Sequence, residues 1–251
     1  MGGRCAESRA HMVVSKPTCM SLQYVDIVFK VIAFLFAISF HESAHAWMAN
    51  RCGDPTARML GRITLNPIKH IDPIGTVVLP LIAMVTGFPV LGWAKPTPVD
   101  PSNFKNQVAD DILTSVVGPI SNFLVASGAV IVLLGISFTS QAGNSIVHVL
   151  PFAYGHPDEL AAQTTSLLLP LSLLFYELMV INVVLGVFNL IPVPPLDGSH
   201  VLRHFLPESA RRVYDTMGWF GLLALVYFGG NLLGRLIFPV LSVFNAVLLR
   251  F

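Results

Sequence analysis

Five apolar stretches constrain this chain more than any other feature, because a backbone that enters lipid must satisfy its own hydrogen bonds. They lie at residues 25–49, 74–93, 112–138, 167–191 and 217–249. A helix that spans a membrane needs about 20 apolar residues, at about 1.5 Å of rise each. Only 12% of the 251 residues are charged, against about 25% in typical soluble domains. The sequence therefore predicts an all-α polytopic membrane protein with about five to six membrane segments.

The composition narrows the possible partners of such a chain. The formal net charge is +1, and lysine and arginine form no basic stripe, so we expect no binding to nucleic acid. The three cysteines, Cys5, Cys19 and Cys52, lack the spacing of a cysteine zinc site and cannot all pair in disulfides. We expect the lipid bilayer to surround the chain, and the oligomeric state stays open.

Prolines, glycines and charges divide the chain further. Residues 1–22 are polar, and we interpret them as a tail before a single integral-membrane domain at 23–251. Two prolines and a glycine interrupt the stretch at 74–93 and favour a re-entrant element between the first and second core helices. The stretch at 217–249 exceeds one span and is broken by GGNLLGR, so it predicts one kinked helix or two short ones.

Two histidines and a glutamate lie at the end of the first apolar run, in the motif HESAH. His41 and His45 are four residues apart, so on a helix both imidazoles lie on one face and can share a metal ion. Glu42 lies beside that face, where it reaches a water molecule at the metal without being a ligand. Each ionisable group costs roughly 2.5–3.5 kcal/mol at membrane depth on insertion scales. The alternative, polar residues satisfied inside a bundle, explains neither the spacing nor the intervening acid.

A histidine pair needs a third ligand from elsewhere in the chain. The candidates are His70, Asp72, Asp197, His200 and His204. The segment NLIPVPPLDGSH singles out Asp197, because three prolines end an apolar segment there and free the backbone near the membrane boundary. The following Gly198 allows a tight turn. On spacing alone, an ordinary helix end with a surface aspartate remains the alternative.

Together these motifs resemble the site-2 protease family of intramembrane zinc metalloproteases. The family pattern joins an HExxH helix to an N-x-x-P-x-P-x-L-D-G segment, which NLIPVPPLDG matches from Asn189 to Gly198. A G-P-x-x-N element between the two is matched by GPISN at residues 118–122. The stretches GDPTARMLGRITLNPIKHIDPIGTVVLP and GWAKPTPVDP resemble the compact bacterial branch without PDZ or CBS domains.

The resemblance implies a zinc-dependent metalloendopeptidase that cleaves peptide bonds within or near transmembrane segments, as in regulated intramembrane proteolysis. It implies one Zn²⁺ per chain, held by His41, His45 and Asp197. Glu42 would then be the general base, and Asn122 would position the substrate or stabilise charge. The expected partner is a transmembrane protein or peptide substrate.

The ligands and the positive charges predict how the chain crosses the membrane. His45 and Asp197 can share a metal only if the chain between them crosses an even number of times, and the stretches at 112–138 and 167–191 supply two crossings. Lysines and arginines gather in three connections, whereas 139–165 has none. The positive-inside rule then predicts a multi-pass protein of the inner (plasma) membrane whose site opens toward the cytoplasm. The basic N-terminal tail conflicts with this scheme, because one crossing places it outside.

A substrate helix must be locally extended before it is cut, because its amides are bonded to one another. The segment LGWAKPTPVD at 91–100 is β-compatible, and its prolines favour an edge strand that a substrate strand can join. A plain proline-rich loop is the alternative. Glu177, Asn182 and Asn189, in the fourth apolar stretch, predict either an inter-helix network or a water path.

The alternative function is a membrane metal-ion transporter or a metal-binding membrane protein, because intramembrane His, Asp and Glu serve ion binding equally well. A transport site does not need a glutamate directly after the first histidine. The motif therefore favours the protease.

Overall fold

The computed structural model describes residues 19–78, 82, 93–154, 166 and 168–251. Its elements, in chain order, are α1 (Cys19–Cys52), α2 (Thr56–Met59), η1 (Pro67–Lys69), η2 (Pro73–Val78), η3 (Pro101–Asn103), α4 (Gln107–Thr139), α5 (Gln141–Ala153), α7 (Leu168–Asn189), α8 (Asp197–Arg203), α9 (Glu208–Phe228) and α10 (Gly230–Arg250). Every regular element among the described residues is helical, so the all-α prediction is confirmed for that part of the chain.

Among the described residues, four helices are long and apolar enough to cross a membrane, as expected of a multi-pass membrane protein. They cover Val25–Cys52, Gln107–Thr139, Leu168–Asn189 and Gly230–Arg250. The first three match predicted stretches, but the total within the described residues is smaller than the number of segments predicted. The stretch at 74–93 accounts for part of the difference. Its first residues form the π-helical turn η2, and most of its other residues lie outside the described part of the chain.

The last apolar stretch forms two helices rather than one. Helix α9 ends at Phe228 and α10 begins at Gly230, with Gly229 between them. Within α9 the backbone leaves the helical region at Gly218, where φ is +42°, a conformation that favours glycine. The apolar window of α10 is only 6% buried, so most of that helix faces outward, where lipid can solvate it.

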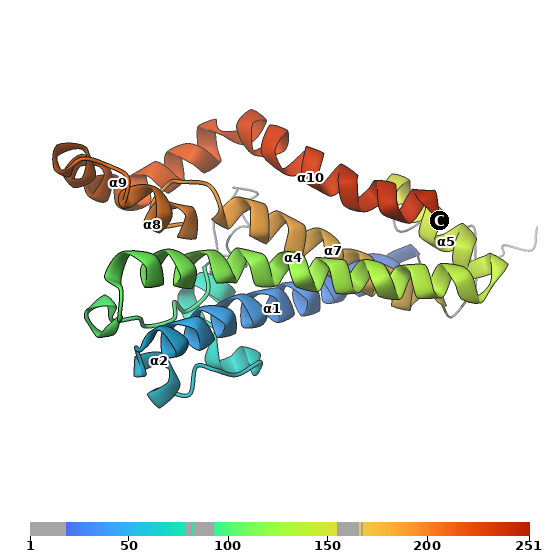
Figure 1. Ribbon diagram of the computed structural model, residues 1–251. Coiled ribbons are helices and arrows are strands. Elements are labelled where there is room, and N and C mark those ends of the chain that lie inside the picture. Colours follow the sequence, from blue (N-terminus) through green and yellow to red (C-terminus); the bar gives the residue numbers. More distant parts are fainter. Residues whose placement is uncertain (1–18, 79–81, 83–92, 155–165, 167) are drawn as a thin grey trace, which may run out of the picture.

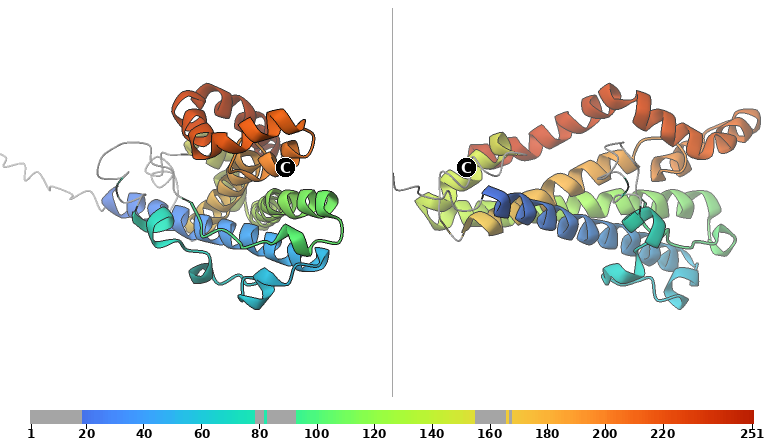
Figure 2. Two further views of the ribbon diagram at one scale, coloured as in Figure 1. Left: turned by 90° about the vertical axis from the view of Figure 1, so that its left-hand side faces the viewer. Right: turned by 180° about the vertical axis from the view of Figure 1, so that it is seen from behind.

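Three long helices, α1, α4 and α7, pack side by side and form the core (Figure 1). Small residues at Ala126 and Ala129 let α4 approach its neighbours closely, because lipid tails leave packing as the main attraction between helices. Met179 and Val183 of α7 are fully buried in the same cluster. Helices α9 and α10 lie on one side of these three helices, and the segment at 53–78 lies on the opposite side (Figure 2).

The connections of the core helices lie at two opposite ends of the bundle. Helix α4 leads from the end that carries α2 and α8 to the end that carries α5, and α7 returns (Figure 1). Counted over the described helices, the chain therefore crosses the bundle twice between HESAH and Asp197, as the even-crossing argument requires. The C-terminus lies at the α5 end (Figures 1 and 2).

Two local features differ from the sequence expectation. Helix α5 was not predicted; Ser140 caps it by accepting a bond from Gly143 N at 3.0 Å, and Val147 and Leu150 pack into the core. The edge strand predicted at 91–100 is not formed in its described part, 93–100, which has no regular structure. The physical reason is pairing: the described residues contain no neighbouring strand for this segment to join.

Candidate metal centre

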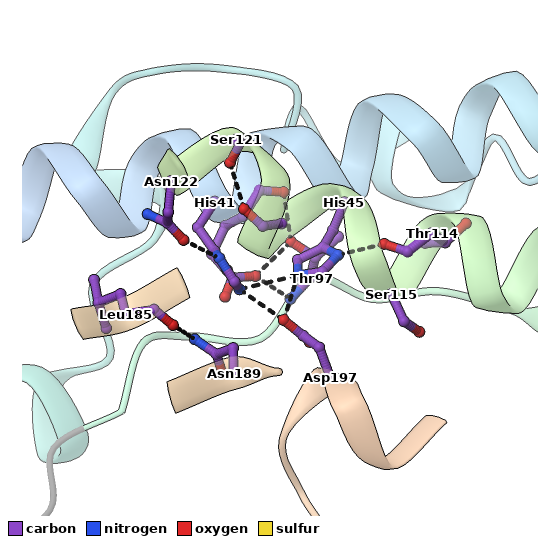
Figure 3. A network of polar contacts seen from close by, with 12 residues as sticks. His41, His45, Thr97, Thr114, Ser115, Ser121, Asn122, Leu185, Asn189 and Asp197 are labelled. Atoms are coloured by element: carbon purple, nitrogen blue, oxygen red, sulfur yellow. Dashed lines mark hydrogen bonds and ion pairs between the residues drawn. The ribbon is translucent and has the colours of Figure 1, made fainter. Parts of the chain in front are cut away.

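Two histidines and one aspartate from distant parts of the chain converge inside the bundle (Figure 3). The Nε2 atoms of His41 and His45 lie 3.0 Å apart. Asp197 Oδ2 lies 3.1 Å from His41 Nε2 and 3.3 Å from His45 Nε2. Both histidines are buried. Across the described ranges, this is the one group of three His, Cys, Asp or Glu side chains spaced to hold a metal ion.

Each candidate ligand is positioned by a simple local rule. The two histidines project from one face of α1, because residues four apart on a helix are neighbours. Asp197 is the first residue of α8, directly after the proline-rich turn that ends α7. Gly198 makes that position possible, because a Cβ there would overlap the carbonyl group of Leu190. The turn of the chain thus places the carboxylate beside the end of α7.

The other ring nitrogen of each histidine faces an acceptor. His41 Nδ1 lies 2.7 Å from Asn122 Oδ1, and His45 Nδ1 lies 2.6 Å from the carbonyl oxygen of Thr114. Amide and carbonyl oxygens only accept hydrogen bonds, so each Nδ1 carries the hydrogen and donates it. Each Nε2 is then left with a lone pair, which is the form that binds a metal.

A metal ion fits the donor atoms that remain. Two Nε2 lone pairs and a carboxylate oxygen face one another, and Asp197 Oδ2 is buried without a hydrogen-bond partner. Such acceptors repel one another unless a cation lies among them. Zinc bonds of about 2.0–2.1 Å at tetrahedral angles separate neighbouring ligand atoms by about 3.3 Å, close to the distances found here. Two imidazoles and one carboxylate also form a ligand set of catalytic zinc sites.

Gly118 of the GPISN motif makes room for both imidazoles. A Cβ at this position would overlap His45 Nε2 and lie 2.7 Å from His41 Cε1. The missing side chain lets α4 approach the histidine face of α1. Sequence reasoning used Gly118 only as part of a motif, and its role in packing against the rings became visible in the structure.

The carboxylate of Glu42 is held by a residue that sequence reasoning did not single out. The backbone N–H of Thr97 donates to Glu42 Oε2 at 2.9 Å, and the Thr97 hydroxyl donates to the same oxygen at 2.7 Å. Figure 3 shows Thr97 in the network around the three ligands. The sequence feature that could have pointed to Thr97 is its hydroxyl between two prolines in KPTPVD, within the segment considered for substrate pairing.

Buried charged groups anchor the segment at 93–100. Arg62 donates to the Pro96 carbonyl at 3.0 Å, directly before Thr97. At the last residue of the segment, the backbone N–H of Asp100 donates to the fully buried Asp54 at 2.8 Å. These bonds hold the segment beside α1 although it forms no strand.

Two of the other candidate ligands hold the connection between α1 and η2. The fully buried His70 points its Nε2 at the carbonyl oxygen of Thr64, 2.8 Å away. Asp72 accepts from the backbone N–H groups of Ile74 and Gly75, at 3.0 and 2.8 Å. Both side chains therefore stabilise turns, away from the metal-ligand cluster.

The remaining two candidates, His200 and His204, face an acid on α4. His204 Nε2 lies 2.7 Å from Asp111 Oδ2, and His200 Nδ1 lies 3.5 Å from Asp111 Oδ1. These contacts join α8 to the beginning of α4, so they secure the short helix that carries Asp197.

Glu177 lies in a separate charged cluster toward the α5 end. It is 2% exposed; its Oε1 lies 3.9 Å from Lys30 Nζ, and its Oε2 accepts from the Tyr154 hydroxyl at 3.5 Å. Lys30 also donates to Asp26 at 2.6 Å. Of the three residues considered for a network or a water path, Glu177 pairs with charges between helices here, Asn182 bonds to Asn122 of α4, and Asn189 bonds to the Leu185 carbonyl of its own helix.

Comparisons with known proteins agree with this geometry. Residues 29–227 match Peptidase family M50. The chain is 36% identical over 213 residues to the "Putative zinc metalloprotease YwhC" of Bacillus subtilis, covering 84% of this chain and 85% of the relative. It is 27% identical over 215 residues to the "Putative zinc metalloprotease Rip2" of Mycolicibacterium smegmatis, covering 85% of this chain and 71% of the relative. No solved structure matches.

The family match covers most of the chain and includes all the predicted ligands, which favours the protease over the metal-ion transporter. The chain belongs to peptidase family M50, the site-2 protease family of intramembrane zinc metalloproteases.

Proposed function

We propose that the chain uses one zinc ion, held by His41, His45 and Asp197, to hydrolyse peptide bonds within or near the transmembrane segments of other proteins. The observation that carries this proposal is the convergence of two unprotonated Nε2 atoms and a buried carboxylate oxygen among helices long enough to span a membrane. A zinc ion bound there would polarise the scissile carbonyl group and lower the pKa of a water molecule toward roughly 7.

Glu42 supplies the proton transfers in this proposal. It directly follows His41, so its carboxylate accepts a proton from the attacking water and later delivers it to the leaving amine. The two bonds from Thr97 keep the carboxylate in one orientation. Because Thr97 belongs to the segment at 93–100, a substrate lying along that segment would be close to the general base.

The substrate proposal rests on the same segment. Arg62 anchors it at Pro96 and Asp54 anchors it at Asp100, and it has no regular structure of its own. An extended substrate would recover there some of the backbone hydrogen bonds that it loses when its helix opens in lipid. We therefore keep the proposal that substrate pairs along 91–100; residues 91 and 92 lie outside the described residues.

The test compares Glu42→Gln and Asp197→Ala with the unchanged chain, purified in detergent, on a transmembrane peptide. Glu42→Gln should keep its zinc, measured by elemental mass spectrometry, and lose cleavage by about 10²–10⁴-fold, the usual contribution of general acid–base catalysis. Asp197→Ala should lose both its zinc and its cleavage activity. Unchanged cleavage by the Glu42→Gln variant would remove Glu42 from the mechanism, and full zinc content in Asp197→Ala would exclude Asp197 as a ligand.

A further inference from the structure

A chain of buried amides leads from α7 to the metal-ligand cluster. Asn182 of α7 and Asn122 of α4 are both fully buried. Asn122 Nδ2 donates to Asn182 Oδ1 at 2.8 Å, and Asn122 Oδ1 faces His41 Nδ1 at 2.7 Å. Asn182 therefore lies two hydrogen bonds from Nδ1 of His41, the ring nitrogen that does not face the metal site, and it belongs to none of HESAH, GPISN and NLIPVPPLDG.

The donor and acceptor of each hydrogen bond between Asn182 and His41 follow from the bond that Asn182 makes within α7. Asn182 Nδ2 donates to the backbone carbonyl of Leu178 at 2.8 Å. A carbonyl oxygen cannot donate, so the nitrogen of Asn182 must face Leu178 and its oxygen must face Asn122. Asn122 then presents its NH₂ group to Asn182 and its oxygen to His41. Only a protonated Nδ1 satisfies that oxygen, so the lone pair of His41 lies on Nε2.

The two ligand histidines are oriented in different ways. His45 Nδ1 bonds directly to a main-chain carbonyl, that of Thr114, which no side-chain substitution removes. His41 depends on the amide of Asn122, whose orientation is set by Asn182 and by a longer bond of 3.4 Å to the carbonyl of Ala37. Without Asn182, a rotated Asn122 would place N–H groups against His41 Nδ1 and favour the tautomer with hydrogen on Nε2, which does not bind a metal there.

We propose that Asn182 is a positioning residue of the zinc site: through Asn122 it fixes the tautomer and orientation of the His41 ring. This inference rests on the proposed function, because it takes His41 as a zinc ligand. Removing outer partners of metal ligands typically weakens metal binding by roughly 10–100-fold.

The experiment measures zinc affinity directly, by competition with a chelator, using the full chain purified in detergent. Asn182→Leu keeps the number and branching of the side-chain heavy atoms, although its methyl groups are bulkier, and it neither donates nor accepts a hydrogen bond. The matched control is Asn245→Leu, because Asn245 also makes a bond between helices, accepting from the Tyr176 hydroxyl at 3.1 Å, but that bond joins α7 to α10 and does not lead to a ligand. Cobalt(II) replaces zinc in a second measurement, and its visible absorption reports the arrangement of the ligands.

We expect Asn182→Leu to bind zinc about 10–100-fold more weakly and to change the cobalt absorption band, while Asn245→Leu keeps both at the unchanged chain's values. If Asn182→Leu does not fold, judged by its helical circular dichroism, Asn182→Ala is held to the same expectation. Unchanged zinc affinity and cobalt absorption in a folded Asn182 variant would overturn the inference. If the unchanged chain itself binds no zinc, the proposed function fails instead.

Discussion

At the scale of single residues, the cluster depends as much on a missing atom as on the ligands. Gly118 has no Cβ, and the space is filled by the rings of His41 and His45. The rings also need one fixed tautomer each, which Asn122 and the Thr114 carbonyl supply. Ligand identity alone therefore does not make the site, because both rings must also face Asp197.

Gly118→Ala tests this requirement. The added methyl group would overlap His45 Nε2, so one or both rings must move, and we expect zinc affinity to fall by more than roughly tenfold. Gly128→Ala is the matched control, because it lies on the same helix and its Cβ would meet no atom within 4 Å. Zinc titration of both variants in detergent is the measurement. Equal affinities in the two variants would show that the rings do not need this space.

At the scale of elements, the position of α8 decides where Asp197, the proposed third ligand, lies. The helix has seven residues, too few to be stable alone, so its contacts with α4 have to hold it. His204 and His200 supply two of these contacts through Asp111. The hydrogen bond that His200 donates to the Asp111 carboxylate raises the pKa of His200, although burial lowers it.

A pH dependence of stability follows from that shift. A histidine whose pKa is raised by folding stabilises the fold fully below its unfolded pKa, about 6.5, and loses this contribution as pH rises through the folded pKa. We expect His200→Gln to lower the Tm relative to the unchanged chain at pH 6, with a smaller difference at pH 9. His148→Gln is the control, because His148 Nδ1 bonds within its own helix, to the Asn144 carbonyl. A difference in Tm that does not depend on pH would contradict the role given to His200.

At the scale of the whole molecule, the site end and the α5 end of the bundle differ in charge. The connections at the site end carry Arg58, Arg62, Lys69, Lys95, Lys105, Arg203, Arg211 and Arg212, whereas residues 140–166 carry no lysine or arginine. By the positive-inside rule, we propose that the site end faces the cytoplasm and that α5 and the C-terminus face outward.

Single cysteines test this orientation after the three native cysteines are replaced by alanine. Ser102→Cys lies in the exposed η3 turn at the site end, and Ser145→Cys is exposed on α5. A maleimide that does not cross membranes should label Ser145→Cys in intact cells and Ser102→Cys only after the cells are opened. The reverse pattern would place the metal site on the outer side.

Apolar runs and i, i+4 spacing act locally, so they were enough to predict the helical membrane architecture and the grouping of His41, His45 and Glu42 on one helix. The sequence also predicted two crossings between HESAH and Asp197, since ligands of one metal must lie at the same end. The resemblance supplied Asp197 as the preferred third ligand and Asn122 as a site residue.

Which polar groups contact one another became known from the packing of the helices. His70, Asp72, His200 and His204 were open alternatives on spacing, and the structure bonds each of them elsewhere. Three other contacts join residues far apart in sequence: the bonds from Thr97 to Glu42, the packing of the histidine rings against Gly118, and the bond between Asn122 and Asn182. Such contacts follow from how helices pack, and the spacing of residues along one helix carries no information about its neighbours.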